Sequence, residues 1–186
     1  MKGRTVGVIC LILATAATSF MAYETGINPP VGNVAGAFAS IVVLVIISKI
    51  IKVSDVLFYS GLVFVFMASP LGSVINLYRS FGPYDKIVHF ISGFLLAALG
   101  MLIMEKLMKR SSRRCDFEVY ALPMIFAACM FSSGGAGIWE IFEFLADKIA
   151  GGQMQRGMVD TVTDIIAGNI GALFYGGLML SSRRLR

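Results

Sequence analysis

The amino-acid sequence predicts an all-α integral membrane protein, a bundle of six transmembrane helices, and three observations lead to this fold class. The 186 residues are 57% hydrophobic and 15% charged, and the mean hydropathy is +0.80, which is too apolar for a soluble domain. Six apolar stretches are long enough to cross the hydrocarbon core, which takes about 20 helical residues. The connections are short, so we expect one transmembrane domain over residues 1–186.

The first three spans are expected at about 5–23, 31–51 and 56–78. They carry few charges, and their small residues suit close packing of helices. The chain begins with basic residues and an apolar run, as a signal peptide does, but the run is long for one, so we interpret it as the first span. Pro70 in the third span predicts a kink or the end of a helix.

The last three spans are expected at about 87–108, 119–146 and 158–180. Each of them carries polar residues at one end, unlike the first three. Because the chain alternates its direction across the membrane, these three polar ends all fall on the same side. We therefore expect a polar site built from residues 84–175.

The basic residues predict the orientation. The side that holds the N-terminus receives twelve of the sixteen basic residues, namely Lys2, Arg4, Lys49, Lys52, Lys106, Lys109, Arg110, Arg113, Arg114, Arg183, Arg184 and Arg186. The other side receives Arg79, Lys86, Lys148 and Arg156. The positive-inside rule then predicts both termini in the cytoplasm and the polar site on the outer side of the cell (inner or plasma) membrane. The basic residues suit anionic lipid headgroups, and a nucleic-acid partner is not needed to explain them.

Six ionisable residues gather at the outer ends of the last three spans: Asp85, His89, Glu140, Glu143, Asp160 and Asp164. Within each span the two residues are three or four positions apart, so they share one helix face. Acids in a span are costly and usually face the bundle interior, where they pair.

A divalent metal would offset the repulsion among these carboxylates. Carboxylates with a single imidazole suit Mg²⁺, Mn²⁺, Fe²⁺ or Zn²⁺, and we predict all six residues as metal ligands. Protonation, or the neighbouring Lys86 and Arg156, could offset the same repulsion.

Each residue also has a purely structural interpretation. Asp85 and His89 could form an interfacial hydrogen-bonded pair, and Glu140 could extend to the headgroups. Asp160 near a helix start suits the helix dipole, and Asp147 with its neighbour Lys148 is expected in a solvated loop. The gathering of six such residues on one side favours a functional site.

Several other chemistries are not indicated. The chain has no Gly-x-Ser-x-Gly, Walker or His-Glu-x-x-His motif, and its single histidine excludes a two-histidine phosphatase mechanism. Cys10, Cys115 and Cys129 show no paired spacing, so we expect free thiols without a disulfide or zinc role.

The segments "YDKIVHFISGFLLA", "IWEIFEFLAD" and "DTVTDIIAGNIGALFYG" resemble the YjdF-like inner-membrane proteins, an uncharacterised family. The chain also has a looser similarity to the VanZ-like proteins. The motif positions of that family could correspond here to Gln153 or Gln155, Arg156, Asp164 and Asn169. The resemblance covers about residues 84–175. It implies a polytopic membrane protein with a polar cluster and a role at the cell envelope, and it implies no reaction.

The leading functional hypothesis is a metal-dependent hydrolase or transferase that acts on a lipid-linked phosphate or headgroup. We assign His89, Glu143 and Asp164 to catalysis, with His89 or Glu143 as general base. We assign Lys86, Arg156 and Asn169 to binding of the substrate.

Two alternatives stay open. Intramembrane acids and a histidine could form the relay of a proton- or ion-coupled transporter, although the cytoplasmic halves of the spans are nearly all apolar. The acids could also belong to an ion-pair network in a non-catalytic protein, either a scaffold of the cell envelope or a protein that shields against antibiotics. Membrane lipids are the expected partners, and the sequence predicts no oligomeric state.

Overall fold

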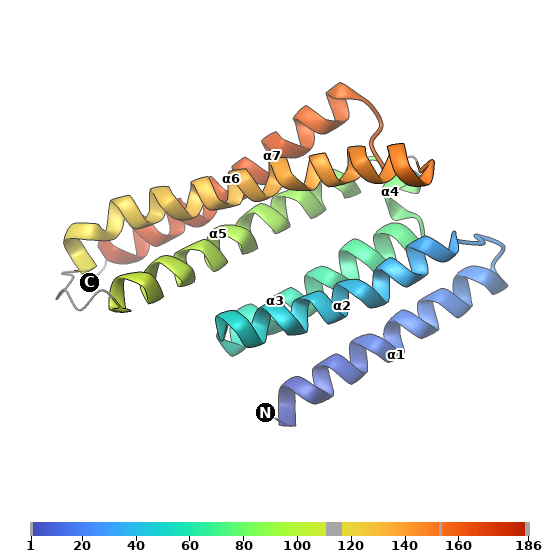
Figure 1. Cartoon of the computed structure of the whole chain (residues 1–186), viewed down its shortest axis with the longest axis horizontal. Helices are drawn as coiled ribbons and strands as arrows, with labels where there is room; N and C mark the ends of the chain where they lie inside the picture. Colours follow the sequence, from blue (N-terminus) through green and yellow to red (C-terminus); the bar gives the residue numbers. More distant parts are fainter. Residues whose placement is uncertain (1, 111–116, 153, 185–186) are drawn as a thin grey trace. The chain divides into compact units, whose positions relative to one another are not determined.

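The structure is a computed structural model that describes residues 2–110, 117–152 and 154–184. All secondary structure in these ranges is helical, and six helices are long and apolar enough to cross a membrane. The predicted fold class is confirmed. The chain divides into two compact units, residues 1–88 and 89–186, which are described in turn (Figure 1).

The first unit consists of α1 (Lys2–Glu24), α2 (Val31–Ile51), α3 (Asp55–Phe66), a π-helix η1 (Met67–Val74) and the short α4 (Leu77–Ser80). Arg4 connects the first helix to the start of the third: its Nε donates to Asp55 Oδ1 (2.6 Å) and its Nη2 to the Val53 carbonyl (2.8 Å). At the other end, a small core of Ala22, Ala37 and Val74 packs the helices together.

Pro70 lies inside the π-helix that continues α3. Proline lacks the N–H that an α-helix needs at each interior position, and here the backbone widens, with the Ile75 N–H donating to the Pro70 carbonyl at 2.9 Å. The third span therefore covers Asp55–Val74 and ends before the predicted residue 78. Asn76 then adopts a left-handed conformation (φ 69°) that turns the chain into α4.

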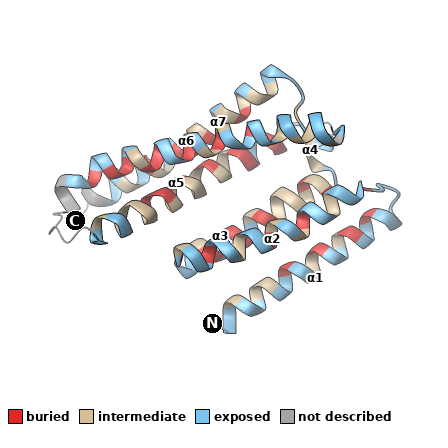
Figure 2. Ribbon diagram, viewed as in Figure 1, coloured by how far each residue is buried: buried red, intermediate tan, exposed pale blue. Residues whose placement is uncertain are grey.

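The second unit is a three-helix bundle of α5 (Tyr84–Arg110), α6 (Phe117–Ala150) and α7 (Met158–Arg184). The boundary between the units falls inside α5, so the first turn of this helix is grouped with the first unit. In Figure 1, α5 and α7 run in the same direction and α6 runs against them. Buried residues, red in Figure 2, follow the facing sides of these helices. Their core contains Ala97, Met101, Met124, Ile125, Ala128, Cys129 and Ala172.

Small residues bring these helices into close contact. A Cβ atom on Gly171 of α7 would overlap the Phe90 carbonyl of α5, and one on Gly93 of α5 would overlap the Gly168 carbonyl of α7. From α6, the buried Ser132 hydroxyl donates to the Gly93 carbonyl at 2.8 Å. The backbones of α5 and α7 are thus in close contact, and α6 joins them through the Ser132 side chain.

The fifth span, α6, extends further than the expected residue 146, to Ala150. Asp147 therefore lies in a helix, and its carboxylate accepts hydrogen bonds from the backbone N–H groups of Met154 and Gln155, both at 2.8 Å. The expectation of a solvated loop at Asp147 was wrong, because the carboxylate supplies acceptors to the connection that follows.

Candidate metal centre

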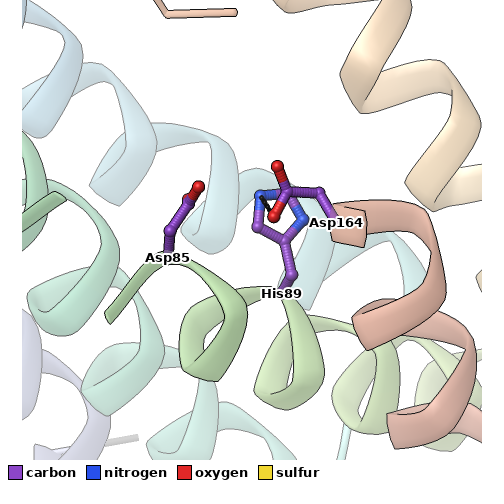
Figure 3. Close-up of side chains that lie close together, drawn as sticks. All are labelled: Asp85, His89 and Asp164. Atoms are coloured by element: carbon purple, nitrogen blue, oxygen red, sulfur yellow. Dashed lines mark ion pairs between the residues drawn. The ribbon is translucent and has the colours of Figure 1, made fainter. Parts of the chain in front are cut away.

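Asp85, His89 and Asp164 come together at the beginnings of α5 and α7 (Figure 3). Each offers one ligand atom, and these atoms all lie within 4.8 Å of one another. The residues are only 7%, 8% and 1% exposed. Among the described residues this is the group of histidine, cysteine and carboxylate side chains that could hold a metal ion.

The helix start determines how α5 presents its two ligands. Because α5 begins at Tyr84, Asp85 and His89 are both helical and lie one turn apart on the same face. Asp164 approaches from α7, and its Oδ1 lies 3.7 Å from His89 Nε2. The backbone of α7 also passes close to His89, since a Cβ on Gly168 would lie 3.6 Å from the His89 carbonyl.

The register between α5 and α7 repeats along both helices. His89 faces Asp164, Gly93 faces Gly168 one turn later, and Ala97 and Ala172, another turn on, belong to the same core cluster. The His89–Asp164 pair is therefore the first of three successive contacts between α5 and α7. The packing at Gly93–Gly168 and Ala97–Ala172 fixes the distance between the two helices at this pair.

Glu140 lies at the same level on α6. The Ser133 hydroxyl donates to Asn169 Oδ1 at 2.5 Å, and a Cβ on Gly168 would lie 3.4 Å from the Cβ of Ala136. Because α6 runs against α7, one further turn along α6 reaches Glu140 while one turn back along α7 reaches Asp164. Glu140 is 5% exposed.

The remaining predicted ligands have other partners. Trp139 Nε1 donates to Glu143 Oε1 at 2.8 Å, one turn apart on α6. Arg156 Nε donates to Asp160 Oδ2 at 3.2 Å, so these two predicted site residues bind each other. Lys86 Nζ lies 3.4 Å from Asp85 Oδ2, beside the cluster.

Asn169 lies about 7.5 Å along the helix axis from Asp164 and accepts the Ser133 hydrogen bond. Cys10 and Cys129 are free thiols, as expected. Cys115, Arg113, Arg114, Arg186 and Gln153 lie outside the described residues.

Two polar contacts around the site were not predicted. One is the Trp139–Glu143 hydrogen bond, which the i, i+4 spacing on a helix could have indicated. The other is the pairing of Ser133 with Asn169. No local pattern in the sequence signals this contact, since it joins two helices through their register.

The arrangement can hold a cation. Two buried carboxylates and an imidazole supply negative charge and three donor atoms of the kinds that bind hard and borderline divalent ions. Without a cation or protons, two buried acids this close would repel each other.

Comparison with known proteins supports the membrane assignment. Residues 4–185 match the family described as "Predicted membrane protein (DUF2238)", which is consistent with the YjdF-like resemblance. The similarity to VanZ-like proteins stays a prediction. An uncharacterized protein of Thermotoga maritima is 35% identical over 103 residues, which cover 55% of this chain and 50% of that protein. The chain thus matches about half the length of this relative. No solved structure matches the chain.

Proposed function

The chain belongs to the DUF2238 family of membrane proteins, and we propose that its Asp85–His89–Asp164 cluster binds a divalent metal ion for chemistry on a lipid-linked phosphate. The observation that carries this proposal is the approach of three buried ligand atoms to within 4.8 Å of one another. Three protein ligands leave coordination positions open for water or substrate, as catalytic metal sites require.

The ligand types are compatible with four divalent metals. Carboxylates suit Mg²⁺ and Mn²⁺, whereas an imidazole suits Fe²⁺ and Zn²⁺. Glu140, which the helix register brings to the level of Asp164, would be a fourth ligand and a third carboxylate, supplied by α6. The metal would then be bound by side chains from all three helices, with two ligands from α5 and one each from α6 and α7.

The substrate class follows from where the cluster lies along the helices. Asp85 is the second residue of α5 and Asp164 lies in the second turn of α7, so the cluster is near the ends of two spans, where lipid headgroups lie. We propose that this is the outer side. A bound metal would polarise a phosphoryl oxygen and lower the pKa of a bound water.

The protein would contribute groups around that metal. His89 is one of the ligands, which leaves Glu143 as the proton acceptor, held in place by the Trp139 indole N–H. Lys86 would neutralise a phosphate oxygen, and Arg156 would present its charge from the loop where it meets Asp160.

The transport alternative receives less support from the bundle. Apart from the Ser133–Asn169 and Ser132–Gly93 hydrogen bonds, the facing sides of α5, α6 and α7 are packed around the apolar core of Ala97, Met101 and their neighbours. A relay needs polar groups across the whole membrane, so this core favours a one-sided site.

The first test is the metal content of detergent-purified protein by mass spectrometry, compared with His89→Ala and Asp164→Asn. We expect about one metal per chain in the wild type and its loss in both variants. Glu105→Gln is the matched control, because Glu105 is on the same helix about 30 Å beyond Asp85. It should keep the metal.

The second test is catalytic. Protein loaded with the metal found above should release phosphate from phosphatidic acid or from a polyprenyl diphosphate, and Glu143→Gln should lose this activity while it keeps the metal. A folded wild type without metal would contradict the binding proposal. Metal binding without any reaction on lipid phosphates would contradict the proposed chemistry alone.

A further inference from the structure

Tyr84, the residue before Asp85, is anchored to the π-helix. Its hydroxyl donates to the Met67 carbonyl at 2.8 Å, and the residue is only 7% exposed. Met67 is the first residue of η1, and Tyr84 is the first residue of α5. One part-buried hydrogen bond thus connects the π-helix to the start of the helix that carries two of the three candidate metal ligands.

A second contact supports the same anchor. The rings of Tyr78 and Tyr84 meet edge to face, with centroids 5.6 Å apart. The Tyr78 ring in turn fills the space beside Gly72 of η1, where a Cβ atom would overlap it. The two tyrosines therefore engage the π-helix at Met67 and at Gly72, so Tyr84 has little freedom to move.

The anchor matters because of the place of Asp85 in its helix. The first turn of a helix lacks the hydrogen bonds that hold later turns and tends to fray. His89 lies one turn further in and packs against α7, whereas Asp85 depends on the first turn being ordered. The hydrogen bond of the Tyr84 hydroxyl, together with burial of the Tyr84 residue next to Asp85, opposes that fraying.

We propose that Tyr84 is a positioning residue that holds Asp85 in ligand geometry through its hydrogen bond to the Met67 carbonyl. This inference rests on the proposed metal binding. It gives the π-helix a role in the site, since η1 supplies the acceptor that fixes the first turn of α5. Widened turns of this kind occur often at functional sites.

The test is a titration of the purified full-length protein with Co²⁺, whose visible absorption reports the number and geometry of its ligands. Tyr84→Phe removes the hydroxyl and keeps the ring against Tyr78. We expect it to weaken Co²⁺ binding about three- to tenfold and to shift the Co²⁺ spectrum toward that of Asp85→Asn. Tyr120→Phe, at an exposed position on α6, is the control and should match the wild type.

A double-mutant comparison separates positioning from a general loss of stability. If Tyr84 acts through Asp85, Tyr84→Phe should have no further effect in the Asp85→Asn background. An equal effect in both backgrounds would overturn the inference, and so would wild-type affinity in Tyr84→Phe. If the wild type binds no Co²⁺, the metal-binding proposal itself fails, and the inference fails with it.

Discussion

Gly93 of α5 and Gly168 of α7 are in backbone contact, because a Cβ atom on Gly93 would overlap the Gly168 carbonyl. The contact lies one helical turn from the His89–Asp164 pair on both helices. A side chain on Gly93 would push the helices apart at this crossing, and the imidazole and carboxylate would separate with them. The absence of a side chain at Gly93 therefore helps to set the distance between His89 and Asp164, although Gly93 supplies no ligand atom itself.

Gly93→Ala is expected to destabilise the protein by about 1–3 kcal/mol, because the new methyl group overlaps the Gly168 backbone carbonyl, which cannot change rotamer as a side chain could. Thermal unfolding in detergent measures this loss, and metal content should fall in parallel. Gly134→Ala is the matched control, because a Cβ there meets nothing within 4 Å and alanine favours a helix by up to about 1 kcal/mol. Equal unfolding temperatures for the two variants would contradict the backbone contact.

Asp164 and Asp160 are one turn apart on α7 but differ in their partners. Asp164 is 1% exposed beside His89, whereas Asp160 is bound to Arg156. Asp164→Asn should weaken metal binding by at least about 10- to 100-fold, because even the loss of a residue that only supports a ligand has an effect of this size. Asp160→Asn should leave the stoichiometry unchanged in a metal titration. A larger loss for Asp160→Asn would mean that the metal lies closer to the start of α7.

Most of the fold could be predicted from the sequence. The length and apolarity of each stretch identify six spans because the thickness of the bilayer dictates both. The end of the third span was harder to predict. Pro70 signalled a disturbance there, but whether a helix kinks, stops or widens into a π-helix depends on what packs around it, and here Tyr78 occupies the space beside Gly72.

The candidate site was predicted at the level of helix faces. Asp85 and His89 share a face because α5 begins before both of them, and alternation of the spans brings Asp164 to the same end. The sequence did not indicate which three of the six residues come together, because this depends on the rotation of each helix and on the register between the helices. These follow from Gly93, Gly168 and Gly171, whose contacts join helices far apart in the sequence.

The orientation of the chain is open to a labelling experiment. The distribution of lysine and arginine predicts that the α4 turn is outside and the end of α7 is in the cytoplasm. In a protein whose native cysteines are replaced by serine, a membrane-impermeant maleimide should label Ser80→Cys in intact cells. Ser182→Cys should react only after the cells are opened. The reverse pattern would place the candidate metal centre on the cytoplasmic side.

The Asp147 carboxylate is one of the groups that hold the connection between α6 and α7. The Asp147 carboxylate accepts hydrogen bonds from the backbone N–H groups of Met154 and Gln155. Gly151 and Gly157 turn the chain on either side of these two residues, with positive φ angles of 68° and 106°. Asp147→Ala removes both acceptors. A hydrogen bond to a charged group contributes about 1.5–3 kcal/mol, so the open form of the loop should become at least about tenfold more populated.

Trypsin measures this opening, because Arg156 lies within the loop. In detergent, cleavage after Arg156 should be at least about tenfold faster in Asp147→Ala than in the wild type, if opening is fast relative to cleavage. Lys148→Ala is the control: its ammonium lies over the Phe144 ring of the same helix, 5.6 Å from the centroid, and its loss should leave that cleavage rate unchanged. Equal rates in wild type and Asp147→Ala would show that other contacts hold the loop. An increased rate together with retained metal would show that Asp147 orders the Arg156 segment independently of the Asp85–His89–Asp164 cluster.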